Sequence, residues 1–463
     1  PLYSSAASDV YKRQSEYSGK KVLIEFESVY HNAEVYINGK KAAYRPYGYT
    51  NFYVDTEGFL KYEAQNEIRV IARNSDQPNS RWYSGTGIYR PVYLWTGNQK
   101  YIPVNGIKIH TVSYAPAVIE VEIKTSCLGR VKAEVLDKEN CILTQEVENT
   151  GHPSVFRMEI PNAKLWDCEH PNLYTLRATF GEDVVEENFG IRLLEWNPEK
   201  GLTINGKREI LRGACVHHDN GVLGACTYPE AEERRVRILK ENGYNAIRSS
   251  HYPCSKDMLD ACDRQGMLMM DEYVDVWYIH KTKYDYAGYL NEWWQQDIKD
   301  MVEKDYNHPC VIMYSTGNEI PERDGRSGGY QLSREITDCF KRNDPTRPVT
   351  NALCNASPDA DVEGMDANLL KNADQIYFAR VTEAFAAPLD VTGYNYMPER
   401  FEMDHAYFPN KVFCATETAP ADSCHGWSLV ERFPFLIGDF VWTAMDYIGE
   451  AGIGRTLVDE PLE

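Results

Sequence analysis

The feature that most constrains the fold is a regular alternation of short apolar segments with longer amphipathic ones across residues 211–442. The apolar segments have the length of buried strands, and the amphipathic ones have the helical period. Strands are expected at residues 211–216, 245–249, 267–270, 311–314, 348–353, 389–394, 412–415 and 437–442, with helices at 229–242, 255–265, 292–306 and 331–342. This alternation predicts a closed (β/α)8 barrel, the TIM barrel, over residues 196–463. We expect the chain to stop before an eighth barrel helix.

The residues before the barrel have the period of β-strands. Residues 16–98 alternate and contain an Asn38-Gly39 dipeptide, which closes two-residue hairpins, so they predict a partial β-sandwich. Residues 99–195 carry regularly spaced strands and fit an immunoglobulin-like sandwich. Residues 1–15 have neither period, and we expect a non-native or disordered leader there.

Charge and composition exclude several classes of partner. The chain has 49 Lys plus Arg against 69 Asp plus Glu, and its net charge of −20 repels nucleic acid and anionic membranes. No apolar run approaches the ~20 residues of a membrane-spanning helix, so no membrane partner is expected. The 12 cysteines are scattered without a Cys-x-x-Cys pair, which favours a reducing, cytoplasmic location. The unusual N-terminal end leaves a periplasmic or secreted location open.

Aromatic residues are abundant, with 32 Tyr and 9 Trp in the 463 residues. Rings in that number suit a hydrophobic core, and they also suit a carbohydrate cleft, where they stack on apolar sugar faces. One aromatic and basic loop, residues 81–85, is expected to be structural and to cover the end of the first sandwich.

Polar residues gather where the predicted barrel strands end, the edge at which such barrels hold their functional side chains. They are His217-His218-Asp219, Arg248, His251, Asp271-Glu272, Asn318-Glu319, Asn395-Tyr396, Glu417 and Trp442. Glu319 and Glu417 follow the fourth and seventh strands and would face each other. A carboxyl pair suits glycoside cleavage, because one group protonates the leaving oxygen and the other meets the positive anomeric carbon. The alternatives are a helix cap for Glu319, core hydrogen bonding for the histidines and barrel packing for Trp442.

Three separated segments resemble the signatures of glycoside hydrolase family two, and of its bacterial β-galactosidase-like members above all. They are residues 245–253, 308–319 and 438–442. The resemblance extends over the chain from about residue 16. It implies a jelly-roll sugar-binding sandwich, an immunoglobulin-like domain and a TIM barrel, in a chain truncated at both ends. It also implies an oligosaccharide or glycoside substrate and, as in many family members, a homo-oligomer. No cofactor is expected.

The resemblance implies roles for the residues at the strand ends. Glu319 matches the general acid/base of a retaining double displacement, and Asn318 matches the residue that binds the sugar 2-hydroxyl. Glu417 matches the nucleophile, and Tyr396 the tyrosine that hydrogen-bonds it. Arg248 would then hold Glu417 ionised. The two carboxyl groups should lie roughly 5 to 5.5 Å apart, the spacing for direct attack on the sugar.

Four further residues match positions in the sugar pocket of the family. Trp442 matches its aromatic floor, and His251, His217 and Asp219 match contacts to sugar hydroxyls.

The sequence departs from the best-known relatives at one metal site. Those proteins carry a Glu-x-His element just after the acidic pair of the third strand. The matching positions here are Val276, Trp277 and Tyr278, so no such metal site is expected. The acidic pair itself, Asp271-Glu272, is expected to have a hydrogen-bonded structural role.

The absence of lysine near the C-terminus bears on which sugar the protein would accept. Members that act on glucuronides hold the sugar carboxylate with an Asn-x-Lys element after the eighth strand, and residues 419–463 contain no lysine. A terminal, non-reducing β-D-galactoside is therefore the favoured substrate of an exo-acting enzyme. A β-glucuronide and other neutral β-glycosides are the alternatives. A non-catalytic carbohydrate-binding fragment is the alternative from another class.

Overall fold

The computed structural model describes residues 4–11, 17–62, 64–354 and 375–446. Eight parallel strands form a closed barrel in chain order, which confirms the predicted TIM barrel. The strands are β20 (Leu211–Val216), β21 (Ala246–Ser249), β22 (Leu268–Glu272), β23 (Val311–Asn318), β24 (Val349–Cys354), β25 (Val391–Asn395), β26 (Val412–Thr418) and β27 (Leu436–Met445). Both β23 and β26 run past their predicted ends. Asn318 and Glu417 are therefore strand residues with fixed backbones.

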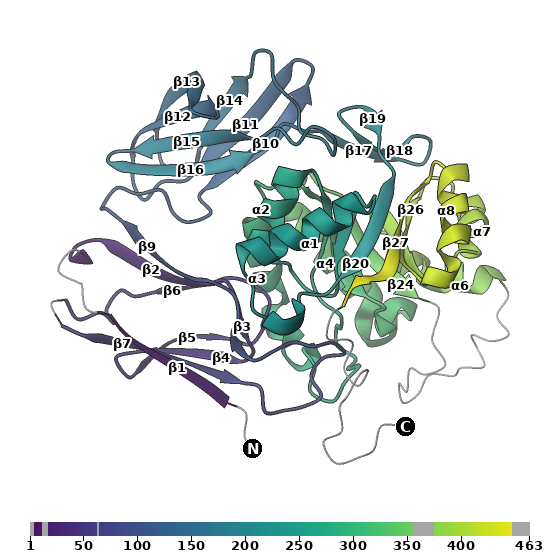
Figure 1. Cartoon of the computed structure of the whole chain (residues 1–463), viewed down its shortest axis with the longest axis horizontal. Coiled ribbons are helices and arrows are strands. Elements are labelled where there is room, and N and C mark those ends of the chain that lie inside the picture. Colours follow the sequence, from purple (N-terminus) through teal and green to yellow (C-terminus); the bar gives the residue numbers. More distant parts are fainter. Residues whose placement is uncertain (1–3, 12–16, 63, 355–374, 447–463) are drawn as a thin grey trace.

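The barrel helices lie outside the strands, as Figure 1 shows. Those predicted are α1 (Pro229–Glu241), α2 (Lys256–Gln265), α3 (Ala287–Asp305) and α4 (Gly329–Asn343). The later ones are α6 (Gln375–Ala386), α7 (Arg400–Tyr407) and α8 (Ser423–Arg432), and short 3-10 helices are η2 (Gly221–Leu223), η3 (Pro321–Asp324), η4 (Arg326–Gly328) and η5 (Pro420–Asp422). The expectation that no eighth helix follows concerns residues 447–463, which lie outside the described residues.

The first β region is built from two main sheets over a small apolar core. One sheet has the order β1 (Ser4–Tyr11), β7 (Asn66–Arg73), β4 (Ala33–Ile37) and β5 (Lys40–Arg45), and the other β6 (Phe52–Asp55), β2 (Lys21–Phe26) and β9 (Val92–Gly97). A third, short pair joins β3 (Val29–Tyr30) to β8 (Gly87–Ile88). Phe26 stacks on Phe52 between the two main sheets, at a ring distance of 5.1 Å.

The leader expected at residues 1–15 is in part ordered. Ser4–Tyr11 form β1, which pairs antiparallel with β7 from Ser4 opposite Arg73 to Tyr11 opposite Asn66. These eight residues form a strand where a non-native or disordered leader was expected. Without β1, the edge of β7 would expose unpaired backbone N–H and C=O groups, and any extended segment of suitable length can satisfy them.

The second β region has a larger core between two sheets. Their orders are β10 (Ile107–Tyr114), β11 (Ala117–Ile123), β14 (Ser154–Glu159), and β13 (Asn140–Asn149), β12 (Gly129–Asp137), β15 (Tyr174–Phe180), β16 (Asp183–Phe189). A small sheet of β17 (Leu194–Asn197), β18 (Gly201–Ile204) and β19 (Lys207–Arg208) leads into the barrel. Asn307 clamps this region to the barrel, because its amide bonds both the N–H of Ile109 and the C=O of Ile107, each at 2.9 Å.

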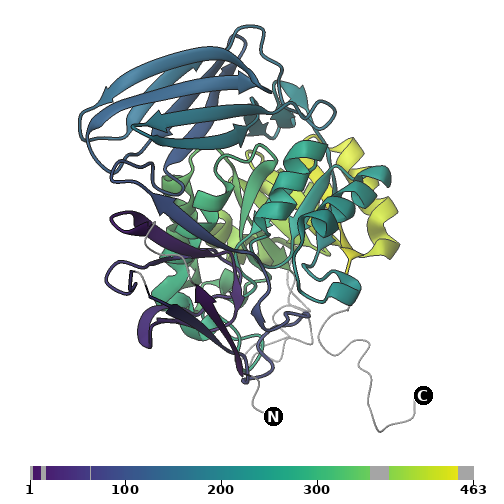
Figure 2. The same cartoon turned by 60° about the vertical axis from the view of Figure 1, so that its left-hand side comes forward.

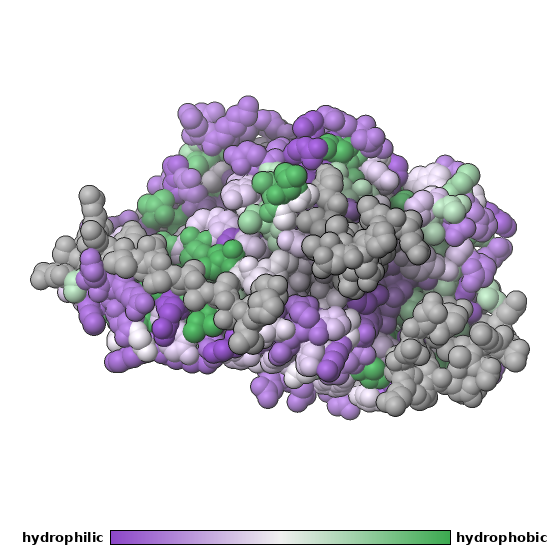
Figure 3. Space-filling view, turned by 60° about the horizontal axis from the view of Figure 1, so that its bottom comes forward, coloured by the Kyte–Doolittle hydropathy of each residue, from purple (hydrophilic) through white to green (hydrophobic). Residues whose placement is uncertain are grey.

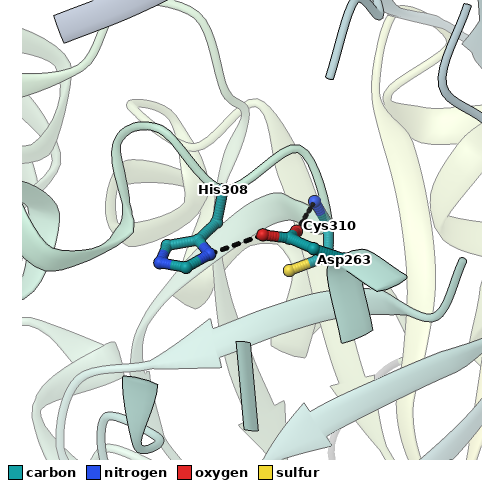
Figure 4. A group of neighbouring side chains, drawn as sticks. All are labelled: Asp263, His308 and Cys310. Carbon is teal, nitrogen blue, oxygen red and sulfur yellow. Dashed lines mark hydrogen bonds and ion pairs between the residues drawn. The ribbon is translucent and has the colours of Figure 1, made fainter. Parts of the chain in front are cut away.

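The turn that opens β23 is fixed by three side chains (Figure 4). The Nδ1 of His308 lies 2.6 Å from one carboxylate oxygen of Asp263 in α2, and the N–H of Cys310 donates to the other at 2.9 Å. The Cys310 thiol donates to the C=O of Leu259. These groups lie close enough together to hold a metal ion. Their short bonds to one another and to the backbone give them a structural role, which anchors the strand that ends at Asn318.

The first sandwich packs directly on the barrel, and Figure 2 shows it alongside the barrel's end. Tyr47, Tyr49 and Trp82 belong to the same continuous core as the barrel residues. Tyr49 stacks on Tyr252 with ring centroids 4.1 Å apart. A second tie is Arg45, which forms ion pairs with two carboxylates of α3. The sandwich is therefore placed firmly against the barrel mouth.

Exposed apolar side chains occur on the outer surface, among them the run from Val92 to Trp95 on β9. On the face turned forward in Figure 3, the coloured surface is mainly hydrophilic and its apolar residues form separate small groups. Within the described parts of the chain, no helix is both long and apolar enough to cross a membrane. All twelve cysteines lie in described segments, and each is a free thiol.

Candidate active site

Arg248, on β21, is the centre of the polar cluster at the barrel mouth, and its side chain is fully buried. One of its terminal nitrogens donates to Glu417 at 2.7 Å and to the C=O of Thr416 at 3.0 Å. The other donates to Glu272 at 2.6 Å and to the Oδ1 of Asn318 at 3.0 Å. The guanidinium thus ties four strands together at their carboxyl ends, as the predicted geometry requires.

Glu417 is 4% exposed, and Arg248 donates a hydrogen bond to its carboxylate at 2.7 Å. The backbone N–H of Tyr396 donates to the backbone C=O of Glu417 at 2.8 Å. Burial raises the pKa of Glu417, and the charge of Glu319 raises it further, while Arg248, His251 and Tyr396 lower it. The contact expected from Arg248 is present, but burial outweighs it, and the net shift is upward.

Glu319 follows β23 directly and faces the same cluster. The Nδ2 of Asn395 lies 3.3 Å from its carboxylate and also donates to Asn318 at 3.0 Å. The cap alternative fails, because the next helix, η3, starts after Ile320 and has no side-chain cap. Glu319 and Tyr396 have positive φ angles of 46° and 56°. Such left-handed backbone is costly for non-glycine residues and is concentrated at functional sites.

His251 and Trp442 form a wall of the site. Their rings stack in parallel, with an interplanar angle of 5° and centroids 5.2 Å apart. The Nδ1 of His251 lies 2.7 Å from Glu272, and its Nε2 lies 3.8 Å from Glu417. His251 therefore lies beside the carboxylates, with Trp442 stacked on it. The Trp442 side chain is partly open to solvent.

His217 lies next to His251 and Trp442, and one of its ring nitrogens is free to accept a hydrogen bond. Its Nδ1 lies 2.8 Å from the C=O of Ser250, so this nitrogen must carry the proton and Nε2 has a free lone pair. Nε2 is buried and has no partner among the described residues. Burial, with the charge of His251 next, lowers the pKa of His217 to about 3. The ring of Trp442 lies 5.3 Å away, edge-on.

Three further acidic residues named from the sequence lie in and around the cluster, and of these Glu272 belongs to it through Arg248. Asp219 is buried, and its charge acts on Tyr252. Glu272 bonds Arg248, His251 and Ser315. Asp271 bonds the N–H of Cys254 and the ammonium of Lys304. Both carboxylates are thus engaged in hydrogen bonds and ion pairs within the protein, and their structural role stays a prediction.

The positions that a metal site would need do not offer metal ligands. Val276 and Trp277 are buried in the core. Trp277 donates its ring N–H to the C=O of Thr316 at 3.1 Å.

Sequence reasoning missed the contribution of the first sandwich. The loop at residues 81–85 was expected to be structural, but Trp82 packs against His251 with centroids 5.7 Å apart, and Arg81 reaches Asp275 of the barrel. A pocket opens between this loop and the barrel, lined by both residues together with Asp275, Lys281 and His251. The sequence signal was the aromatic and basic character of the loop. Its position opposite the barrel mouth required the tertiary structure.

Comparison with known proteins places the chain in a family. Residues 198–388 match the model described as glycosyl hydrolases family 2, TIM barrel domain, and residues 106–192 match the model described as glycosyl hydrolases family 2. A β-galactosidase of Bacteroides ovatus is 33% identical over 94% of this chain and 59% of its own length. A β-glucuronidase of Bacteroides fragilis is 25% identical over 96% of this chain and 70% of its own length.

Solved structures agree with these matches. A family 2 glycosyl hydrolase of Bacteroides cellulosilyticus superposes with a TM-score of 0.86 at 33% identity, covering 97% of this chain and 60% of that one. A β-glycosidase of Bacteroides vulgatus gives 0.81 at 29% identity, with 97% and 63% covered. This chain thus spans a little under two thirds of these relatives. It belongs to glycosyl hydrolase family 2.

Proposed function

We propose that the protein is a retaining, exo-acting β-glycosidase that removes terminal β-D-galactosyl units. The observation that carries the proposal is the arrangement around Glu417. Its carboxylate is buried at a strand end and held by Arg248, and the charge of nearby Glu319 raises its pKa. Two coupled carboxyl groups of different surroundings at a barrel mouth match the needs of glycoside cleavage.

The first step forms a covalent glycosyl–enzyme. A carboxylate oxygen of Glu417 attacks the anomeric carbon while Glu319 gives its proton to the leaving oxygen, and the glycosidic bond breaks. In the second step Glu319, now a carboxylate, takes a proton from water. The water oxygen attacks the anomeric carbon and Glu417 leaves. A separation of roughly 5 to 5.5 Å between the two carboxyl groups is part of this proposal.

The remaining site residues would bind the sugar. Asn318 would donate to the 2-hydroxyl, and the unpaired Nε2 of His217 would accept a hydrogen bond from another hydroxyl. His251 and Asp219 would contact further hydroxyls, and Trp442 would carry the apolar face of the ring.

A β-galactoside is preferred over a β-glucuronide for two reasons. The relative of higher identity is named a β-galactosidase. The cations Arg81 and Lys281 at the mouth both already donate to Asp275, at 2.7 and 2.8 Å, so they are engaged before any sugar carboxylate arrives. A β-glucuronidase remains the second candidate, because a relative that matches over 96% of this chain has that name.

The test compares initial rates on an aryl β-galactoside and the matched aryl β-glucuronide, with Glu417→Gln as the control variant. The proposal predicts faster cleavage of the galactoside and loss of both activities in the variant. Faster cleavage of the glucuronide would keep the carboxylate pair and replace the substrate. Equal activity in Glu417→Gln would refute the nucleophile.

A further inference from the structure

Asp275 is a buried carboxylate that the catalytic steps do not use, although it lies within the site. It follows β22 and is 5% exposed. Arg81, from the first sandwich, grips it with two parallel bonds of 3.0 and 2.7 Å. Lys281 donates to the same carboxylate at 2.8 Å. Burial opposes the charge, but these two cations hold the pKa of Asp275 well below its usual range, so it is a fixed anion.

The carboxylate of Asp275 is directed at Asn318, the side chain proposed to bind the sugar 2-hydroxyl. The Nδ2 of Asn318 donates to Asp275 at 3.0 Å, and its Oδ1 accepts from Arg248 at 3.0 Å. A guanidinium can only donate and an ionised carboxylate can only accept, so these two partners fix which end of the amide points where. Lys281 also donates to the backbone C=O of Asn318, at 2.7 Å.

The two amide hydrogens of Asn318 face different partners. The Nδ2 carries two hydrogens, and Asp275 takes one of them. The second faces His251 Nε2 at 3.4 Å, a long hydrogen bond next to the proposed nucleophile, and the 2-hydroxyl of the substrate would take the place of His251 as its acceptor. Rotation or a shift of Asp275 would move this hydrogen away from the sugar.

We propose that Arg81 and Asp275 are positioning residues, through which the first sandwich sets the amide of Asn318 for the 2-hydroxyl of the substrate. The inference rests on the proposed function. It makes the sandwich a part of the catalytic apparatus, because a side chain 37% exposed on its loop supplies the bidentate grip. The contact between the sandwich and the barrel thereby fixes the position of the amide that would bind the reacting sugar.

The test compares Arg81→Met on an aryl β-galactoside and on its 2-deoxy analogue. The variant is expected to lose roughly 10- to 100-fold in kcat/KM on the first substrate and less than about threefold on the second. Arg45→Met is the matched control, because Arg45 also joins the sandwich to buried carboxylates but does not touch Asn318. This control should leave the ratio between the two substrates unchanged.

Equal losses on the two substrates would overturn the inference, since Arg81 would then touch the substrate or act by general loosening. A second test does not need activity. Arg81→Met and Asn318→Ala are combined in a double-mutant cycle followed by thermal unfolding. Non-additive shifts in Tm support the coupling, and additive shifts refute it. Absence of hydrolysis by the unaltered protein would refute the proposed function alone, because the cycle still tests the coupling.

Discussion

Replacement of Arg248 by Met should destabilise the protein more than a normal core substitution. Met fills a similar volume but leaves the carboxylates of Glu272 and Glu417 without their shared cation, at 0% and 4% exposure. Removing one partner of a buried ion pair costs about 3–5 kcal/mol. For a domain of this size that corresponds to a fall in Tm of about 6–20 °C, at roughly 2–4 °C per kcal/mol.

The fall in Tm caused by Arg248→Met should be smaller at low pH than at high pH. Burial raises the pKa of Glu272, but Arg248 and His251 outweigh it and hold this pKa below its ordinary value. A carboxyl group of this kind contributes stability above its unfolded pKa of about 4.3, and that stability is lost as the pH falls through the folded value. In Arg248→Met, Glu272 and Glu417 have lost their cation, so they take up protons as the pH falls and are then no longer buried unpaired charges. The gap in Tm between the two proteins should therefore narrow between about pH 7.5 and pH 5.

Thermal unfolding at the two pH values, followed by circular dichroism, measures this gap. Arg347→Met is the control, because Arg347 is equally buried and paired with Asp344 at the other end of the barrel. It should lower Tm as well but leave kcat unchanged. A fall below about 2 °C for Arg248→Met, or the same fall at both pH values, would refute the reasoning.

Three further predictions concern single side chains. Tyr396→Phe removes a hydroxyl that lowers the pKa of Glu417, and it should lower kcat on an aryl glycoside roughly 10- to 100-fold with little change in KM; an unchanged kcat would exclude a role for this hydroxyl. His217 should stay neutral between about pH 5 and 8, since burial lowers its pKa to about 3, and a 15N shift of Nε2 that titrates in this range would disagree. For His308, burial lowers the pKa but the pairing with Asp263 outweighs it and the net shift is upward. The stabilisation is therefore complete below about pH 6.5 and lost as pH rises through the folded pKa, so His308→Gln should cost more Tm at about pH 5.5 than at pH 8.5; the reverse order would exclude the ion pair.

The barrel was predictable from the sequence because its strands are buried on both faces and appear as uninterrupted apolar runs. The first strand, β20, has the predicted bounds, and Gln265 ends α2 as expected before the left-handed Gly266. Strand ends were less predictable. The last residues of β23 and β26 are polar, because the site itself occupies those positions, and polar residues do not carry a strand signal.

Contacts between segments that are distant in the sequence could not be predicted from the sequence. Arg81 and Asp275 are far apart in the chain, and neither has a local pattern that indicates a partner. Asn395 was noted only as the neighbour of Tyr396, yet its amide joins Asn318 to Glu319. The pairing of β1 with β7 was missed for a similar reason, since backbone bonds at a sheet edge place few demands on the residue types.

The central claim is that Glu417 forms a covalent bond to the sugar, and one measurement tests it directly. The protein is incubated with 2-deoxy-2-fluoro-β-galactosyl fluoride, whose reactive leaving group allows the first step while the 2-fluorine slows the second. Intact mass followed by peptide mapping then locates the label. The account predicts one added fluorogalactosyl unit per chain on Glu417, and none in Glu417→Gln. A label on Glu319 or Glu272, or an unlabelled chain that still cleaves β-galactosides, would contradict it.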